Sequence, residues 1–142
     1  MQPGLLDSSI YISALRRGND AALALRRLAT DAPLWLSAVV LEELYAGALG
    51  PERGVIEHLE HQFDKANRIL VPNLSDWTQV GRALARLAAE HHYEKIGRGR
   101  LTNDTLIAAS AGRLGFRVMT TNERDFRKLS EFLNFQWQVM TF

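Results

Sequence analysis

Short apolar runs alternate with longer amphipathic segments along the chain. The runs are typical of buried strands, and the segments between them carry apolar residues at helical spacing, as Val55, Ile56 and Leu59 do. We predict strands at residues 4–6, 34–37, 69–71, 117–120 and 135–139. We predict helices at residues 10–15, 20–29, 39–49, 52–68, 75–92, 102–114 and 123–129, with a Gly/Arg loop at 94–100. Strands separated by helices indicate parallel crossovers, so we expect one three-layer α/β/α domain over residues 1–142 with a mainly parallel central sheet of about five strands.

Three acidic residues fall where the predicted strands reach one edge of this sheet. Asp7 directly follows the first strand, and Asp125 follows the fourth, with Asn122 just before it. Asp104 lies in the predicted first turn of the helix that leads into the fourth strand. Open parallel sheets bind ligands beyond the carboxyl ends of their strands. We therefore expect the three acids to face one site.

Each of these acids also has a purely structural interpretation. Leu101 and Ile107 lie three residues from Asp104 on the same helical face, which predicts a buried carboxylate that needs a partner or ligand. An aspartate in a first helical turn can instead be stabilised by the helix dipole. Asp7 could cap the following helix, and Asp125 could be a turn or cap residue. Only the convergence of the acids indicates a functional site.

A fourth acid comes from the adjacent pair Glu42 and Glu43. Both have apolar neighbours one helical turn away, so periodicity does not choose between them. Gly47, one turn after Glu43, leaves room for a close approach. At least one member of such a pair is expected on a solvated face.

The composition limits the chemistry that such a site could use. The 142 residues include no cysteine, which excludes disulfides, thiolate metal sites and cysteine nucleophiles and makes the reducing cytoplasm the expected location. The net charge of +1 is too small for nucleic-acid binding through bulk electrostatics, so any polyanion must be held locally. The apolar runs are too short to span a bilayer, and we expect no membrane association.

Carboxylates without histidine or cysteine partners are hard oxygen ligands. Such ligands suit Mg²⁺, with Mn²⁺ as an alternative, and argue against zinc. Close negative charges cannot all stay ionised unaided, whereas a bound cation would relieve their repulsion, attract a phosphate and polarise it. The acids Asp7, Asp104 and Asp125, with one of the two glutamates, therefore predict a metal-dependent nuclease.

Three blocks carry these acids along the chain. They are Leu5-Leu6-Asp7-Ser8-Ser9; Ser37-Ala38-Val39-Val40-Leu41-Glu42-Glu43-Leu44-Tyr45-Ala46-Gly47-Ala48; and Asn103-Asp104-Thr105-Leu106-Ile107-Ala108-Ala109, continued by Thr120-Thr121-Asn122-Glu123-Arg124-Asp125-Phe126. Together they resemble the PIN-domain ribonucleases, most of all the VapC toxins of bacterial toxin–antitoxin pairs. In that family the acid directly precedes Leu and stands one turn before Gly, which selects Glu43 over Glu42. The first block departs from the family's usual Asp-Thr-Ser, because Ser8 replaces the threonine and keeps the hydroxyl.

The resemblance implies specific roles for these residues. The catalytic and metal-binding residues would be Asp7, Glu43, Asp104 and Asp125, supported by Ser9 and Asn122. The implied reaction is endonucleolytic hydrolysis of RNA by a metal-activated water, leaving a 5′-phosphate. The implied partners are the RNA substrate, a cognate antitoxin that blocks the acidic site, and a second copy of the chain in a homodimer.

Arg98 and Arg100 precede Asp104 on the predicted Gly/Arg loop. They are candidates for contacting RNA phosphates, and the alternative is that they are solvated loop arginines.

The same arrangement of acids is compatible with other classes of protein. A phosphoacceptor receiver domain also gathers aspartates at a sheet edge, but it requires adjacent acids after the first strand and a lysine near the last strands. Ser8-Ser9 and Thr120-Thr121 occupy those places, which disfavours a receiver. A PIN-fold module that binds RNA or protein without cleaving, and an RNA-processing nuclease without an antitoxin, stay open.

Overall fold

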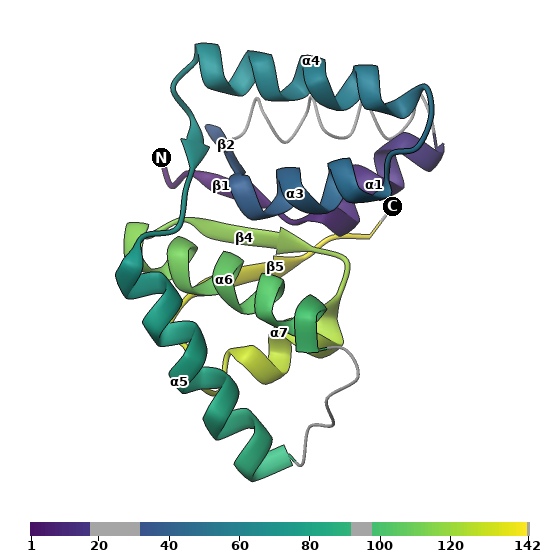
Figure 1. Cartoon of the computed structure of the whole chain (residues 1–142). Coiled ribbons are helices and arrows are strands. Elements are labelled where there is room, and N and C mark those ends of the chain that lie inside the picture. The colour runs from purple at the N-terminus through teal and green to yellow at the C-terminus, as the bar shows by residue number, and fades with distance from the viewer. Residues whose placement is uncertain (18–31, 92–97, 142) are drawn as a thin grey trace.

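The central feature of the fold is a five-stranded, all-parallel sheet with strand order β3-β2-β1-β4-β5. The computed structural model in Figure 1 describes residues 1–17, 32–91 and 98–141. The strands are β1 (Gly4–Leu6), β2 (Leu34–Ser37), β3 (Ile69–Leu70), β4 (Arg117–Thr120) and β5 (Gln136–Val139). The predicted mainly parallel sheet is confirmed. The predicted helix at residues 20–29 lies outside the described residues.

Helices cover the sheet on both sides. They are α1 (Ser8–Arg17), α3 (Ala38–Gly47), α4 (Glu52–Lys65), α5 (Leu74–His91), α6 (Arg98–Leu114) and α7 (Glu123–Leu129). Figure 1 shows α1, α3 and α4 grouped on one side of the sheet, and α5, α6 and α7 on the other. This is the three-layer α/β/α arrangement that the alternating pattern predicted. No helix among the described residues is both long and apolar enough to cross a membrane.

The order of the strands creates a crevice between β1 and β4. The chain steps outward from β1 to β2 and β3 on one side, and then crosses to β4 and β5 on the other. Neighbouring connections diverge at such a switch point, which is where open parallel sheets bind ligands. The β1–β4 register pairs Leu6 with Met119, so Asp7 and Thr120, the next residue of each segment, emerge beside each other at the carboxyl edge.

The core is formed by apolar side chains of both layers. Leu5, Leu36 and Val118 are fully buried in the sheet, and Phe126 of α7 and Ile107 of α6 are fully buried against it. Tyr11 is also buried. Trp77 is 53% exposed, although it fits the apolar stripe of the helix predicted at residues 75–92. Its place in an apolar helical stripe was misleading, because α5 buries a narrower face, centred on Val80, Ala83 and Leu87, against its neighbours.

The starts of α5 and α6 are defined by their first residues and by the bonds around them. The residue that caps α5 is Asn73: its Oδ1 accepts from the backbone N–H of Asp76 at 2.9 Å, and Asp76 Oδ2 accepts from the N–H of Asn73 at 2.9 Å. Such reciprocal bonds form a capping box. Helix α6 begins at Arg98, four residues before the predicted start at residue 102. It ends at Leu114, as predicted, and Gly115 follows with φ +73°.

Candidate active site

A cavity of about 460 Å³ opens at the carboxyl edge of the sheet, at the crevice between β1 and β4. Its lining comes from the start and inner face of α1, from α3, from α6 and from the segment after β4. The lining residues are Asp7, Ser8, Ser9, Ile12, Ser13, Arg16, Glu43, Asp104, Thr121 and Asn122. Three of the four predicted acids and both predicted supporting residues therefore lie around one space.

Asp7 is held from both sides of the crevice. Its side chain is 3% exposed. Its Oδ1 accepts from the backbone N–H of Ser9 at 3.0 Å and from the Ser9 hydroxyl, and its Oδ2 accepts from the Thr120 hydroxyl at 2.6 Å. Capping of α1 explains the bond to the Ser9 N–H alone, so the structural interpretation of Asp7 accounts for only part of its environment. Burial raises the pKa of Asp7 above its ordinary value, although the hydrogen bonds from Ser9 and Thr120 act in the opposite direction.

Asp104 is a buried carboxylate in the body of a helix. Its side chain is 5% exposed, and Leu101 and Ile107 on the same face are buried, as the pattern predicted. Because α6 begins at Arg98, Asp104 lies in the second turn and not in the first. The helix dipole acts mainly on the first turn, so it does not account for this aspartate. The position of Asp104 in the cavity wall leaves a ligand site as its better explanation.

The two adjacent glutamates of α3 have different surroundings. Glu43 is half-buried and lines the cavity, whereas Glu42 is exposed and accepts a hydrogen bond from Asn103 Nδ2 at 3.1 Å. Helical geometry turns adjacent residues about 100° apart, so only one of the two can face the crevice. The structure places Glu43 there.

Asp125 is connected to the cavity through Asn122. It lies in the first turn of α7, half-buried, and its Oδ2 accepts from Asn122 Nδ2 at 2.9 Å. Asn122 lines the cavity and also caps α7, accepting from the backbone N–H of Asp125 at 3.4 Å. Its capping and site roles are therefore compatible. Asp125 itself is not part of the cavity lining.

Thr120 is a site residue that the sequence reasoning missed. It is fully buried at the end of β4, donates to Asp7 Oδ2 and accepts from the backbone N–H of Asn122 at 2.9 Å. A second bridge runs from the backbone N–H of Thr121 to the Ser9 hydroxyl at 3.1 Å. The signal in the sequence was a hydroxyl residue at the carboxyl end of a predicted strand, where Thr120 follows Val118 and Met119. Arg16, an exposed cation on the cavity rim, was also missed.

Arg98 and Arg100 lie in the first turn of α6 and not on a loop. The loop prediction was wrong for these two positions, and their side chains lie outside the part of the chain that the structure describes.

The donor atoms of the site are chemically suited to a hard divalent cation. Asp7, Glu43 and Asp104 offer carboxylate oxygens, and Ser9 offers a hydroxyl, while none of the described residues that line the cavity is a histidine. Such oxygen ligands match Mg²⁺ or Mn²⁺. Within residues 1–17, 32–91 and 98–141, no three acidic or histidine side chains are already drawn together closely enough to hold one ion. The ligand types therefore fit the metal, and the side chains would have to converge on it.

Comparison with known proteins agrees with this fold. The PIN domain family matches residues 4–131. No curated protein sequence is significantly similar to the chain. The structure of VapBC2 from Rickettsia felis bound to a DNA fragment from their promoter is similar with a TM-score of 0.70 and 19% identity, covering 99% of this chain and 100% of that chain.

Two further solved structures show the same similarity. DNA-bound VapBC from Salmonella typhimurium has a TM-score of 0.68 and 23% identity over 98% of each chain. VapBC-1 from nontypeable Haemophilus influenzae has a TM-score of 0.67 and 22% identity, covering 97% of this chain and 98% of that chain. At these identities the likeness establishes the fold.

Proposed function

Because this chain belongs to the PIN domain family, we propose that it is a metal-dependent endoribonuclease and the toxin of a toxin–antitoxin pair. The observation that carries the proposal is the cavity at the switch point of the sheet, where Asp7, Glu43 and Asp104 line one space. Carboxylates gathered in this way disfavour one another unless a cation is bound among them.

Asp7, Glu43 and Asp104 would hold the metal, with Asp125 as the fourth acid of the set. When bound, Mg²⁺ or Mn²⁺ would supply a positive charge that offsets the carboxylates and polarises the RNA phosphodiester. Asp125 would contact the metal only if its hydrogen bond to Asn122 Nδ2 broke. With that bond kept, Asp125 would act on the site by orienting the Asn122 side chain.

The residues around the acids position them. The Ser9 and Thr120 hydroxyls donate to opposite oxygens of Asp7, so they hold the plane of that carboxylate toward the crevice. Thr120 in turn is held by the backbone N–H of Asn122, and Ser9 by the backbone N–H of Thr121. The loop after β4 is thereby coupled to the first turn of α1. Partners that orient a metal ligand commonly matter almost as much as the ligand itself.

The toxin role, the RNA substrate and the partners are further parts of the proposal. The likeness to VapBC structures supports a cognate antitoxin for this chain. A homodimer and a cytoplasmic location complete it, and Arg98 and Arg100 remain candidates for RNA contact. The alternatives are an RNA-processing nuclease without an antitoxin, or a PIN-fold module that binds without cleaving.

The test is cleavage of single-stranded RNA by the purified protein with Mg²⁺ or Mn²⁺, with and without EDTA. We expect Asp7→Asn and Asp104→Asn each to lower the cleavage rate by about 100-fold or more, because a lost metal ligand removes charge stabilisation worth several kcal/mol. Full activity in either variant would exclude the assigned metal site.

The chain provides a matched control in the two neighbouring glutamates. Glu43→Gln should abolish most cleavage, whereas Glu42→Gln, the same change one residue away on the exposed face, should retain it. Equal loss in both variants would point to a general effect on α3. Growth arrest on expression, relieved by a co-expressed partner, would support the toxin role, and unimpaired growth with active enzyme would favour RNA processing.

A further inference from the structure

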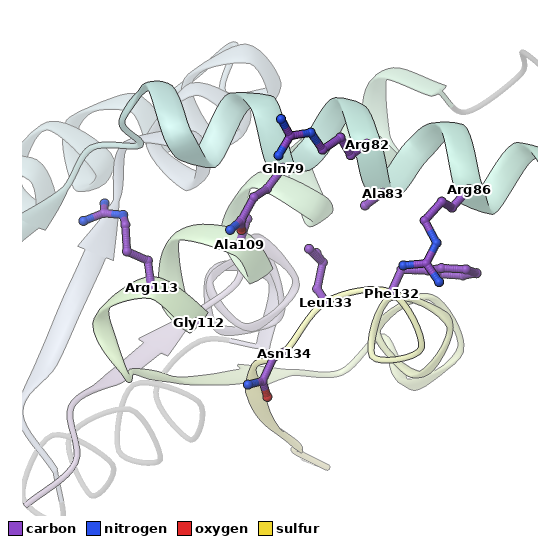
Figure 2. Close-up of a pocket in the computed structure, with 10 residues that line it drawn as sticks. All are labelled: Gln79, Arg82, Ala83, Arg86, Ala109, Gly112, Arg113, Phe132, Leu133 and Asn134. Carbon is purple, nitrogen blue, oxygen red and sulfur yellow. The ribbon is translucent and has the colours of Figure 1, made fainter.

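A second cavity, of about 430 Å³, lies away from the acids, between α5, the second half of α6 and the segment that follows α7. Figure 2 shows its lining residues, among which are Arg82 and Arg86 of α5, Arg113 of α6, and Phe132. No carboxylate is among these lining residues. Gly112 and Asp104 are eight residues apart on α6, which puts this cavity roughly 12 Å along the helix from the catalytic acids.

Two of the three arginines that line this cavity, Arg86 and Arg113, are held in place. The guanidinium of Arg86 lies over the ring of Phe132, 5.1 Å from its centroid, as Figure 2 shows. Arg113 donates through Nε and Nη2 to the two carboxylate oxygens of Asp76, at 2.9 and 3.0 Å. Asp76 is buried, so this pair fixes the Arg113 side chain at the edge of the cavity. Arrangements that are already ordered lose less entropy when a ligand binds.

The third arginine, Arg82, lies on α5 one helical turn before Arg86. Gln79, Arg82 and Arg86 are three and four residues apart on α5, so they follow one face of that helix. Arg82 and Gln79 are exposed, and both line the cavity. Guanidinium groups of this kind make bidentate bonds to phosphate oxygens.

The shape of the cavity depends on Gly112. A Cβ atom at this position would come within 2.4 Å of the backbone oxygen of Asn134 and 3.3 Å of Phe135 Cβ. The glycine therefore lets the segment from Phe132 to Asn134 pack directly on α6 and close the floor of the cavity. The site is built from three separated parts of the chain.

We propose that this cavity binds a backbone phosphate of the RNA substrate at a distance from the cleaved bond. The inference rests on the proposed nuclease function, and it extends that function by naming a second contact for RNA. The chemistry is that of a phosphate ester held by Arg82 and Arg86, the second of which is already ordered over the Phe132 ring. Contacts of this sort supply affinity independent of sequence and make binding depend on salt.

The experiment measures binding of a single-stranded RNA to the full-length protein by fluorescence anisotropy in EDTA, across a range of salt concentrations. We expect Arg82→Glu to weaken RNA binding by about tenfold or more and to reduce the slope of log affinity against log salt by about one. Arg53→Glu is the matched control, because Arg53 is an exposed arginine on α4 outside the cavity, and its binding should stay within about twofold of wild type. Thermal melting of each variant establishes that it folds.

Arg86→Lys supplies a second variant that keeps the charge but not the planar fork, and we expect an intermediate loss of affinity. Inorganic phosphate and AMP are tested as competitors, and they should compete weakly and only in proteins that retain Arg82. Wild-type affinity in Arg82→Glu, or equal loss in the Arg53 control, would overturn the inference. If Arg82 is needed for binding polyglutamate but not for binding RNA, the inference is overturned in favour of an acidic protein partner. If Arg82 is needed for binding phosphate or AMP while RNA binding is unchanged, the inference is overturned in favour of a free-phosphate site.

The two proposals fail separately. Acid-dependent cleavage with Arg82-independent RNA binding would leave the nuclease intact and remove the second contact. RNA binding that depends on Arg82 in a protein that cleaves nothing would remove the nuclease and leave an RNA-binding cavity.

Discussion

Replacing Thr120 by valine tests the contact that couples the two sides of the crevice. Valine has nearly the same shape, so the change removes the hydroxyl without opening a large cavity. It removes the bond of 2.6 Å to Asp7 Oδ2 and the acceptor for the backbone N–H of Asn122 at 2.9 Å. A hydrogen bond to a charged group contributes about 1.5–3 kcal/mol, and a bond between neutral groups about 1 kcal/mol.

We therefore expect Thr120→Val to lower the free energy of unfolding of the metal-free protein by about 2.5–4 kcal/mol. For a chain of this length the melting temperature should fall by roughly 8–14 °C. Because Asp7 loses one of the groups that orient it, the affinity for Mg²⁺ should also fall, by about 10- to 100-fold. The measurements are urea denaturation in EDTA and calorimetric titration with Mg²⁺.

Two controls separate positioning from general damage. Thr120→Ser keeps the hydroxyl and should restore most of the metal affinity. Ser110→Ala removes another fully buried hydroxyl, which donates to the backbone oxygen of Leu106 at 2.7 Å, and it should leave metal affinity unchanged. Unchanged metal affinity in Thr120→Val, or the same loss in Ser110→Ala, would refute the role assigned to Thr120.

Two further changes test the acids and the packing of α6. Asp104→Asn should raise the melting temperature of the protein in EDTA, because it removes a negative charge from a cavity shared with other carboxylates. The control Glu42→Gln, on the exposed face of α3, should change the melting temperature little. A lower melting temperature for Asp104→Asn would instead indicate a structural role. In denaturant unfolding, Gly112→Ala should destabilise the protein by about 1–3 kcal/mol, because the added Cβ would meet the Asn134 backbone oxygen. Gly81→Ala on α5 is the control, since nothing lies within 4 Å of its added Cβ, and it should be neutral or stabilising by up to about 1 kcal/mol. Equal effects of the two glycine changes would contradict the tight packing at Gly112.

The fold could be predicted from the sequence because burial of strands and helices places apolar residues at a regular spacing along the chain. Strands enclosed on both faces read as short apolar runs, and helices that cover them show an apolar stripe. Prediction failed where a local pattern is ambiguous. Trp77 fits an apolar stripe on α5, yet it is exposed, because the width of a buried helical face depends on which neighbours pack against it. The start of α6 was misplaced because Thr102 is a plausible cap within a helix that begins at Arg98.

The candidate site was also predicted in part. The sequence by itself determined that Asp7 and Asp125 follow strands and that Asp104 lies on an apolar helical face, since these depend only on order and spacing along the chain. Only the tertiary structure decided that Asp7, Glu43 and Asp104 line one cavity, and that Asp125 lies outside its lining and bonds to Asn122, which belongs to it. It also decided that Thr120 holds Asp7 and that three arginines border a second cavity. These contacts join residues far apart in the chain, so they depend on how strands pair and helices pack, which no local pattern encodes.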